Sequence, residues 1–319
     1  MNMLNLPRKV YFKKGSMGVA FREFAEVYGF KRAFIISDAN LYRSGAIDSV
    51  EKLMRKKGIR TAEFFSLDEV PTFENVRSGL PKMLEYQPDI IIGIGGGSVM
   101  SAAKAMWLLY ENPEMDLEAV AAKYNTLAAS DNDFPATGRK AKLALMATTA
   151  ATGAECSPFA VLKNDKGEKC VIANYNLIPE MAVIDSVFSE TVSAELAKNG
   201  GLTVLSLAVR AYTAPGASEY TQGFAREAVE SVLANLEAAV AGCPAAREKM
   251  ATAAAVAGMA YSNAADTVDT VAGVYPSEAE KKDSNAQIID LAKHVGFGGA
   301  SDAKVFAAWI EACEKLASL

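Results

Sequence analysis

Histidine is the residue that this sequence most clearly lacks, because His294 is the single one among 319 residues. A site that needs two or three imidazoles therefore cannot be built from this chain alone. Cysteine is also scarce, and the four cysteines are scattered along the chain with no CxxC pair. This pattern argues against a disulfide framework and is typical of buried thiols in a reducing cytosol.

Long apolar runs and an excess of positive charge are absent as well. No apolar run reaches the ~18 residues that a membrane-spanning helix needs, and residues 1–10 contain no apolar stretch ahead of a cleavage site. We therefore expect neither a membrane span nor a secretory signal. The formal net charge of −5 argues against general nucleic-acid binding. Together these absences predict a cytoplasmic protein with no membrane or nucleic-acid partner.

The first half of the chain alternates short apolar runs with amphipathic stretches. Strand-like runs are expected at 32–36, 60–65, 89–94, 143–148 and 181–185, with helical spacing between several of them. Strands separated by helices imply a parallel sheet with crossover connections. After Phe188 the strand-like runs disappear, and helical spacing covers four long stretches, 192–212, 218–240, 245–264 and 302–317. The pattern predicts a dinucleotide-binding α/β domain over residues 1–188 and an all-helical domain over residues 189–319.

The sharpest local signal is a glycine-rich turn that follows an apolar strand and opens a helix. It comprises Gly93, Gly95, Gly96, Gly97 and Ser98. Glycines let the backbone approach a phosphate closely, and the unpaired N–H groups and dipole of the following helix attract an anion. The spacing is neither GxGxxG nor that of a P-loop, so a tight turn without a ligand remains the alternative.

Two further segments fit a nucleotide site. Asp38 ends the first strong strand, where a carboxylate can accept a hydrogen bond from a ribose hydroxyl or simply cap a helix. Thr148, Thr149 and Thr152 make the segment after a later strand rich in hydroxyls, which can contact a ribose or pyrophosphate. The alternative is a capped helix start, with Thr152 as the cap and Glu155 three residues later.

These segments together resemble the iron-dependent alcohol dehydrogenases, especially the alcohol dehydrogenase half of bifunctional aldehyde-alcohol dehydrogenases. The matching stretches are 7–16, 31–38, 71–72, 88–116, 148–161, 178–185, 246–264 and 290–299. The resemblance implies a Rossmann-like α/β domain followed by an all-helical domain, with NAD or NADP in the cleft and a divalent metal, usually iron, between the domains. It places the pyrophosphate on Gly95, Gly96, Gly97 and Ser98, and it places the ribose and nicotinamide beside Thr148, Thr149 and Thr152. It also makes Asp38 the residue that favours NAD.

The sequence departs from this family where the metal ligands should be. The aligned aspartate and histidine are replaced by Thr203 and Leu207, and two later histidines by Thr270 and Val274. The final ligand has no counterpart, and the helical domain is expected to be shortened relative to the family. His294 falls in a stretch that resembles a surface helix, so we interpret it as structural.

Iron and zinc sites of this kind need imidazole and carboxylate donors, so we expect neither metal. Substitute carboxylates are conceivable, at Asp266, Asp269 and Asp283, although their spacing resembles no ligand set. Smaller differences from the family's nucleotide-binding motifs occur at four positions: Ser101, Ala147, Ala151 and Ala154.

Two functional hypotheses follow from this combination. The first is a catalytically silent relative that binds NAD and forms a homodimer, or a hetero-oligomer with an active paralogue. The alternative is an NAD-dependent alcohol or aldehyde oxidoreductase that works without the family metal.

Overall fold

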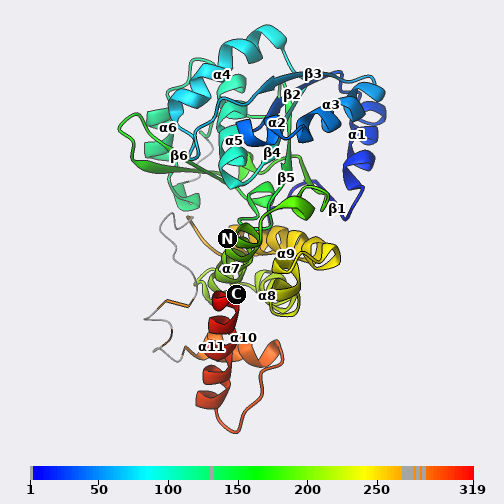
Figure 1. The fold of residues 1–319 in the computed structure, drawn as a ribbon. Coiled ribbons are helices and arrows are strands. Elements are labelled where there is room, and N and C mark those ends of the chain that lie inside the picture. The colour runs from blue at the N-terminus through cyan, green and yellow to red at the C-terminus, as the bar shows by residue number, and fades with distance from the viewer. Residues whose placement is uncertain (1–2, 130–132, 268–275, 278–280, 282–284) are drawn as a thin grey trace.

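The computed structural model describes residues 3–129, 133–267, 276–277, 281 and 285–319. Its centre is a six-stranded, wholly parallel sheet in the order β1-β8-β5-β4-β2-β3 (Figure 1). The strands are β1 (Lys9–Phe12), β2 (Arg32–Ile36), β3 (Arg60–Phe64), β4 (Ile90–Gly95), β5 (Lys142–Ala147) and β8 (Met181–Ile184). An antiparallel hairpin, β6 (Phe159–Lys163) with β7 (Lys169–Ala173), stands apart from this sheet.

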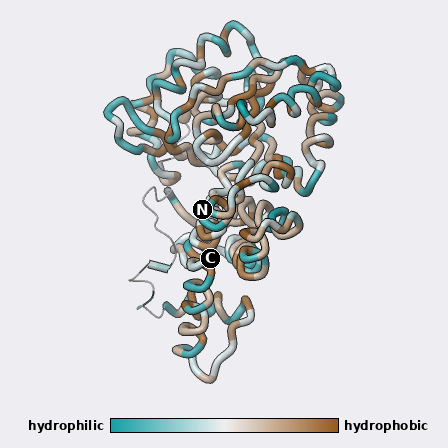
Figure 2. Tube along the Cα trace, in the orientation of Figure 1, coloured by the Kyte–Doolittle hydropathy of each residue, from teal (hydrophilic) through white to brown (hydrophobic). Residues whose placement is uncertain are grey.

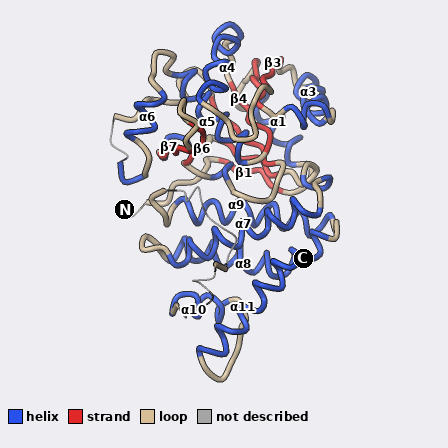
Figure 3. The backbone as a smooth tube through the Cα atoms, turned by 60° about the vertical axis from the view of Figure 1, so that its left-hand side comes forward, coloured by secondary structure: helices blue, strands red, loops and turns tan. Residues whose placement is uncertain are grey.

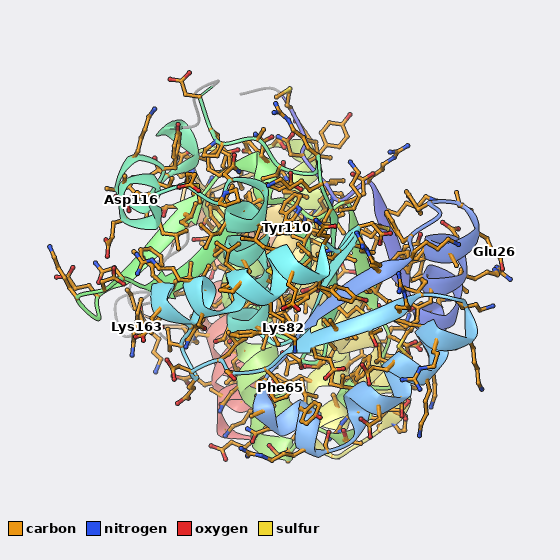
Figure 4. The ribbon with its side chains drawn as sticks, turned by 90° about the horizontal axis from the view of Figure 1, so that it is seen from above. Glu26, Phe65, Lys82, Tyr110, Asp116 and Lys163 are labelled. Carbon is orange, nitrogen blue, oxygen red and sulfur yellow. The ribbon has the colours of Figure 1, made fainter. Side chains whose placement is uncertain are left out.

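Helices cover both faces of the sheet. They are α1 (Ser16–Glu26), α2 (Ala39–Arg43), α3 (Ala46–Lys56), α4 (Phe73–Tyr86), α5 (Gly97–Glu111) and α6 (Leu117–Lys123). Alternate residues of β2 enter different cores: Phe34 packs with residues of α4 and α5, whereas Ile35 packs with residues of α1 and α3. Burial on both faces explains why the strands are nearly continuous apolar runs. Seen from above, Glu26 and Asp116 lie at opposite ends of this part of the molecule (Figure 4).

The described residues from Ala194 onward form a helical region below the sheet (Figure 3). It contains α7 (Ala194–Thr213), α8 (Glu219–Val240), α9 (Pro244–Ser262), α10 (Ala286–His294) and α11 (Asp302–Ser318). Its apolar core extends into the hairpin through Phe159 and Val171. The hydrophobic stretches run through the sheet and between the helices, and hydrophilic stretches lie mainly outside (Figure 2).

The predicted fold class is confirmed: a parallel sheet with helices on both faces is followed by helices. Within the described residues the last strand ends at Ile184 and α7 begins at Ala194. The division into two domains at Phe188 stays a prediction. The expectations did not include β1, the β6–β7 hairpin or the helices α1, α2 and α6. The surface helix expected around His294 is present as α10. Of the helices in the described ranges, none is long and apolar enough to cross a membrane.

Candidate functional site

The glycine-rich turn lies where the connectivity of the sheet reverses direction. From β2 the chain continues to β3 on one side, whereas from β4 it continues to β5 on the other. In open parallel sheets, the crevice outside the carboxyl ends of such neighbouring strands is the usual place for a ligand. Gly95 ends β4 and Gly97 begins α5, so the turn opens directly into this crevice.

The N-terminus of α5 carries no capping side chain. Gly96 is the N-cap, with extended backbone at φ −83° and ψ −173°, and no side chain accepts from the first helical N–H groups. Gly96 and Gly97 are partly exposed and Ser98 is exposed. The first turn of α5 therefore presents unpaired N–H groups and the positive end of the helix dipole towards solvent.

The hydroxyl-rich segment packs directly against this turn. A Cβ added to Gly97 would lie 2.8 Å from Thr152 Oγ1, and one added to Gly96 would lie 3.4 Å from Thr149 Oγ1. The backbone N–H of Thr148 donates to the carbonyl of Gly95 across 3.1 Å. The structure thus brings the predicted glycines and threonines together, although they are separated by about fifty residues in the sequence.

Asp38 follows β2, the neighbour of β4 in the sheet. Its carboxylate accepts from the backbone N–H groups of Asn40 (2.8 Å) and Leu41 (2.9 Å), so it caps α2. The hydroxyl of Ser37 donates to the carbonyl of Ile94 across 2.8 Å and ties the two strand ends together. The capping role expected as one alternative is therefore present, and it leaves Asp38 partly exposed beside the crevice.

The expected cap at Thr152 is wrong. The residues that follow form a single 3₁₀ turn, Ala154–Cys156, whose N-cap is Gly153 with no side-chain hydrogen bond. Thr152 is instead exposed, and Glu155 is 1% exposed with no hydrogen-bond partner for its Oε1 among the described residues. The reason is tertiary: Gly153, at φ +61°, packs against α9 and turns the chain before a helix can start.

Sequence reasoning missed Lys104, which is fully buried on α5. Its ammonium donates to the carbonyls of Ala154 (2.8 Å), Ser157 (2.6 Å) and Phe159 (2.9 Å) and lies 3.1 Å from the Ser157 hydroxyl. Burial lowers the pKa of Lys104 to about 7, an effect that the Glu155 carboxylate opposes. Burial likewise raises the pKa of Glu155 to about 7, and Lys104 opposes that rise. A lysine inside the apolar helix 97–111 was the available signal.

The helical region closes on the same segment through glycine contacts. A Cβ added to Gly258 of α9 would lie 2.4 Å from the carbonyl oxygen of Gly153, and one added to Gly200 of α7 would lie 2.3 Å from that of Ala150. A small pocket of about 20 Å³ lies here, and the buried Arg247 is one of the residues that line it. The residues around it are Thr149, Ala150, Ser189, Val192, Leu196, Ala197, Ala239, Arg247 and Met250.

Two of the positions predicted to replace metal ligands, Thr203 and Leu207, lie on α7. Thr203 Oγ1 donates to the carbonyl of Asn199 in its own helix across 2.8 Å, and Leu207 packs against the helical core. His294, on α10, is exposed, with Nδ1 2.9 Å from the carbonyl oxygen of Asp290. Asp266 is exposed. The other aligned or substitute positions lie outside the described residues: Thr270, Val274, Asp269 and Asp283.

The four residues that differ from the family's nucleotide-binding motifs lie close to the glycine turn and to the threonine-bearing loop. Ser101 Oγ accepts from the backbone N–H of Val161 across 3.1 Å. Ala147 and Ala154 are buried and Ala151 is partly exposed.

Comparison with known proteins places the chain in one family. The model for "Iron-containing alcohol dehydrogenase" matches residues 7–186, and that for the C-terminal part of the family matches residues 197–272. The chain is 39% identical over 267 residues to aldehyde-alcohol dehydrogenase 2 of Entamoeba histolytica, covering 83% of this chain and 30% of that protein. It is 37% identical over 269 residues to the bifunctional aldehyde-alcohol dehydrogenase of Escherichia coli K12, covering 82% of this chain and 30% of that protein.

Solved structures agree with this assignment. A 1,3-propanediol oxidoreductase superposes with a TM-score of 0.84 at 26% identity, over 100% of this chain and 86% of that chain. The iron-containing alcohol dehydrogenase of Thermococcus thioreducens superposes with a TM-score of 0.81 at 25% identity, over 99% and 88%. The chain spans about 30% of the length of the curated aldehyde-alcohol dehydrogenases that it matches. By its sequence and its fold, this chain belongs to the iron-containing alcohol dehydrogenase family.

Proposed function

We propose that this chain is a nucleotide-binding member of the family that holds NAD(H) at the glycine turn, lacks the family metal and is catalytically silent. The observation that carries the proposal is a contrast between two sites. The uncapped N-terminus of α5 lies against the Thr149 and Thr152 hydroxyls, whereas Thr203 and Leu207 occupy the aligned ligand positions on α7.

The nucleotide part rests on groups of the backbone. The free N–H groups of Gly97 and Ser98 and the α5 dipole favour a pyrophosphate. Because Gly96 and Gly97 have no side chains, the Thr149 and Thr152 hydroxyls pack directly against the turn, so hydroxyls and backbone N–H groups can contact the same anion. Asp38 lies at the end of the adjacent strand, where its charge favours a ribose 2′-hydroxyl over a 2′-phosphate. NAD(H) is therefore the dinucleotide that this crevice suits.

The residues on α7 do not fit iron. Leu207 has no lone pair to donate, and the Thr203 hydroxyl is a poor neutral donor that already bonds within its own helix. The one imidazole of the chain is exposed on α10, where Asp290 accompanies it. We therefore derive no chemical step through a metal.

We expect the chain to be catalytically silent because it lacks two contributions to catalysis, a metal ion and a positioned acid. In hydride transfer to a carbonyl, a metal supplies charge stabilisation worth several kcal/mol, and a positioned acid supplies a further ~10²–10⁴-fold. A chain that keeps only the nucleotide site is suited to a regulatory or structural role in an assembly. We therefore propose that it forms a homodimer, or a hetero-oligomer with an active paralogue.

Three measurements on the purified protein test this proposal. NADH titration by calorimetry is expected to show binding, elemental analysis to show less than about 0.1 iron or zinc per chain, and short aldehydes to produce no NADH oxidation with or without added iron or zinc. Stoichiometric metal held by this chain would overturn the metal part of the proposal. Aldehyde-dependent NADH oxidation without metal would favour the alternative of a metal-independent oxidoreductase.

A further inference from the structure

Lys104 lies two turns into α5, the helix whose first residue is Gly97. It is 0% exposed, and its ammonium has four oxygen atoms within 3.1 Å, three of them backbone carbonyls. An ammonium is costly to bury unless its three N–H groups are all satisfied. This cost is met by acceptors that come from one short stretch, residues 154–159.

That stretch directly follows the threonine-bearing loop. One turn before Lys104, the hydroxyl of Ser101 accepts a hydrogen bond from the backbone N–H of Val161. This bond also ties α5 to the first half of β6. Two side chains of one helix thus hold the chain from Ala154 to Val161. They do so through backbone atoms, which fixes the path of the chain rather than the rotamer of one side chain.

The other end of the loop is anchored to β4, where the N–H of Thr148 bonds to Gly95. Residues 149–153 therefore run between two anchors, and both anchors belong to the strand–turn–helix unit that contains Gly95–Ser98. Between them the Thr152 hydroxyl lies against Gly97 and the Thr149 hydroxyl against Gly96. Moving the second anchor would move these hydroxyls relative to the turn.

We propose that Lys104 is a positioning residue, which holds the Thr149–Thr152 loop at the distance from the α5 N-terminus that a dinucleotide pyrophosphate requires. This inference rests on the proposed NAD(H) site and assigns a role that the glycine turn alone does not explain. Lys104 touches no part of the ligand itself. Its effect is transmitted by the carbonyls of Ala154, Ser157 and Phe159.

The test compares ligands with and without a pyrophosphate in the variant K104M, whose side chain has nearly the same length. NADH and ADP-ribose affinities are expected to fall about tenfold or more, because misplacement of the loop costs contacts made only by the pyrophosphate. Adenosine affinity, measured by ligand-observed NMR, is expected to stay within about twofold of wild type. A purely structural role for Lys104 would lower all three affinities alike.

The matched control is F24L, which weakens the core on the opposite face of the sheet. It should lower the midpoint of urea unfolding and leave the NADH affinity unchanged. If K104M does not fold, the double variant S101A/S157A serves instead. It keeps Lys104 and removes the side-chain contacts that Ser101 and Ser157 make between α5 and residues 154–161, and it should lower the NADH affinity about three- to tenfold.

Unchanged NADH affinity in the folded variant, or an equal loss for adenosine, would overturn the positioning role while leaving the nucleotide site intact. Failure of the wild-type protein to bind NADH at millimolar concentration would instead remove the nucleotide site, and the positioning role with it.

Discussion

The glycine turn on β4 and α5 and the predicted ligand positions on α7 differ in how each kind of site is encoded. The glycine turn on β4 and α5 offers N–H groups and a helix dipole, which any sequence able to form that turn supplies. The aligned ligand positions on α7 depend on the side chains themselves, and here these are Thr203 and Leu207. A backbone-made site depends little on the identity of neighbouring side chains, whereas a few substitutions abolish a side-chain-made site. Changes in a few side chains are therefore expected to affect a metal site of this kind more than a backbone-made nucleotide site.

The boundary between these regions also depends on backbone contact. The loop reaches α9 through Gly153 and Gly258 and reaches α7 through Gly200, with separations that leave no room for a Cβ. The helical region thus supports the loop from below while Lys104 holds it from α5. Variants that remove one of these two supports at a time separate their contributions to stability and to NADH affinity.

The largest effect is expected from G153V. Gly153 has φ +61°, and an added Cβ would lie 2.3 Å from the carbonyl oxygen of Ala254. Both strain and overlap arise, so the unfolding free energy should fall by about 3–5 kcal/mol, measured by urea denaturation. The control G167A has φ +79° with nothing within 4 Å of its Cβ, and it should cost only about 1–2 kcal/mol. Equal losses in the two variants would show that the close approach to α9 does not matter.

The next effect concerns ligand binding rather than stability. G97V places a branched side chain against Thr152 at the mouth of the turn. NADH affinity should fall at least about tenfold, equivalent to ~1.4 kcal/mol, because the pyrophosphate loses its approach to the α5 N–H groups. The control G18A adds a methyl to α1 with nothing within 4 Å, and calorimetry should find its NADH affinity unchanged. Normal NADH binding by G97V would place the ligand elsewhere.

Cofactor choice should respond to Asp38 by a smaller factor. Asparagine caps a helix as well as aspartate does, so D38N should leave the thermal midpoint unchanged. Removal of the charge should raise the affinity for NADPH relative to NADH by about two- to fivefold, a modest factor because the carboxylate is partly exposed. Competition binding with the two cofactors measures this ratio, and a ratio equal to that of wild type would assign Asp38 to capping alone.

The smallest effect is a pH dependence at the edge of the sheet. The neighbouring Glu51 carboxylate, followed by burial, raises the pKa of Glu63 on β3 to about 7. A carboxyl whose pKa is raised on folding stabilises the protein at low pH, and this contribution is lost as the pH rises from about 4.5 to about 7. Partial exposure screens the effect to less than about 1 kcal/mol. In the variant E63Q, the urea midpoint should change less between pH 5 and pH 8 than it does in wild type, because glutamine does not titrate. The same dependence of the midpoint on pH in both proteins would contradict the assignment.

Much of the fold was accessible from local patterns. The β-branched run 90–94 is too short and too apolar for anything but a buried strand, and it is β4. The glycine turn then identified the crevice, since glycines between a buried strand and a helix serve close backbone approach. Edge strand β1 was not predicted, because its apolar run, residues 10–12, is short and only one of its four residues is buried. Its strand pairing depends on β8, about 170 residues later.

By itself the amino-acid sequence determined the parallel α/β architecture, the glycine turn and the presence of a single imidazole, because each is a property of composition or of neighbouring residues. Only the tertiary structure decided that Lys104 grips residues 154–159, that Glu155 is buried and that Thr152 faces Gly97 instead of capping a helix. Those outcomes join residues about fifty positions apart, and no local periodicity encodes them. They follow from where β4, α5 and α9 meet, since a buried ammonium must find its acceptors wherever the packed chain presents them.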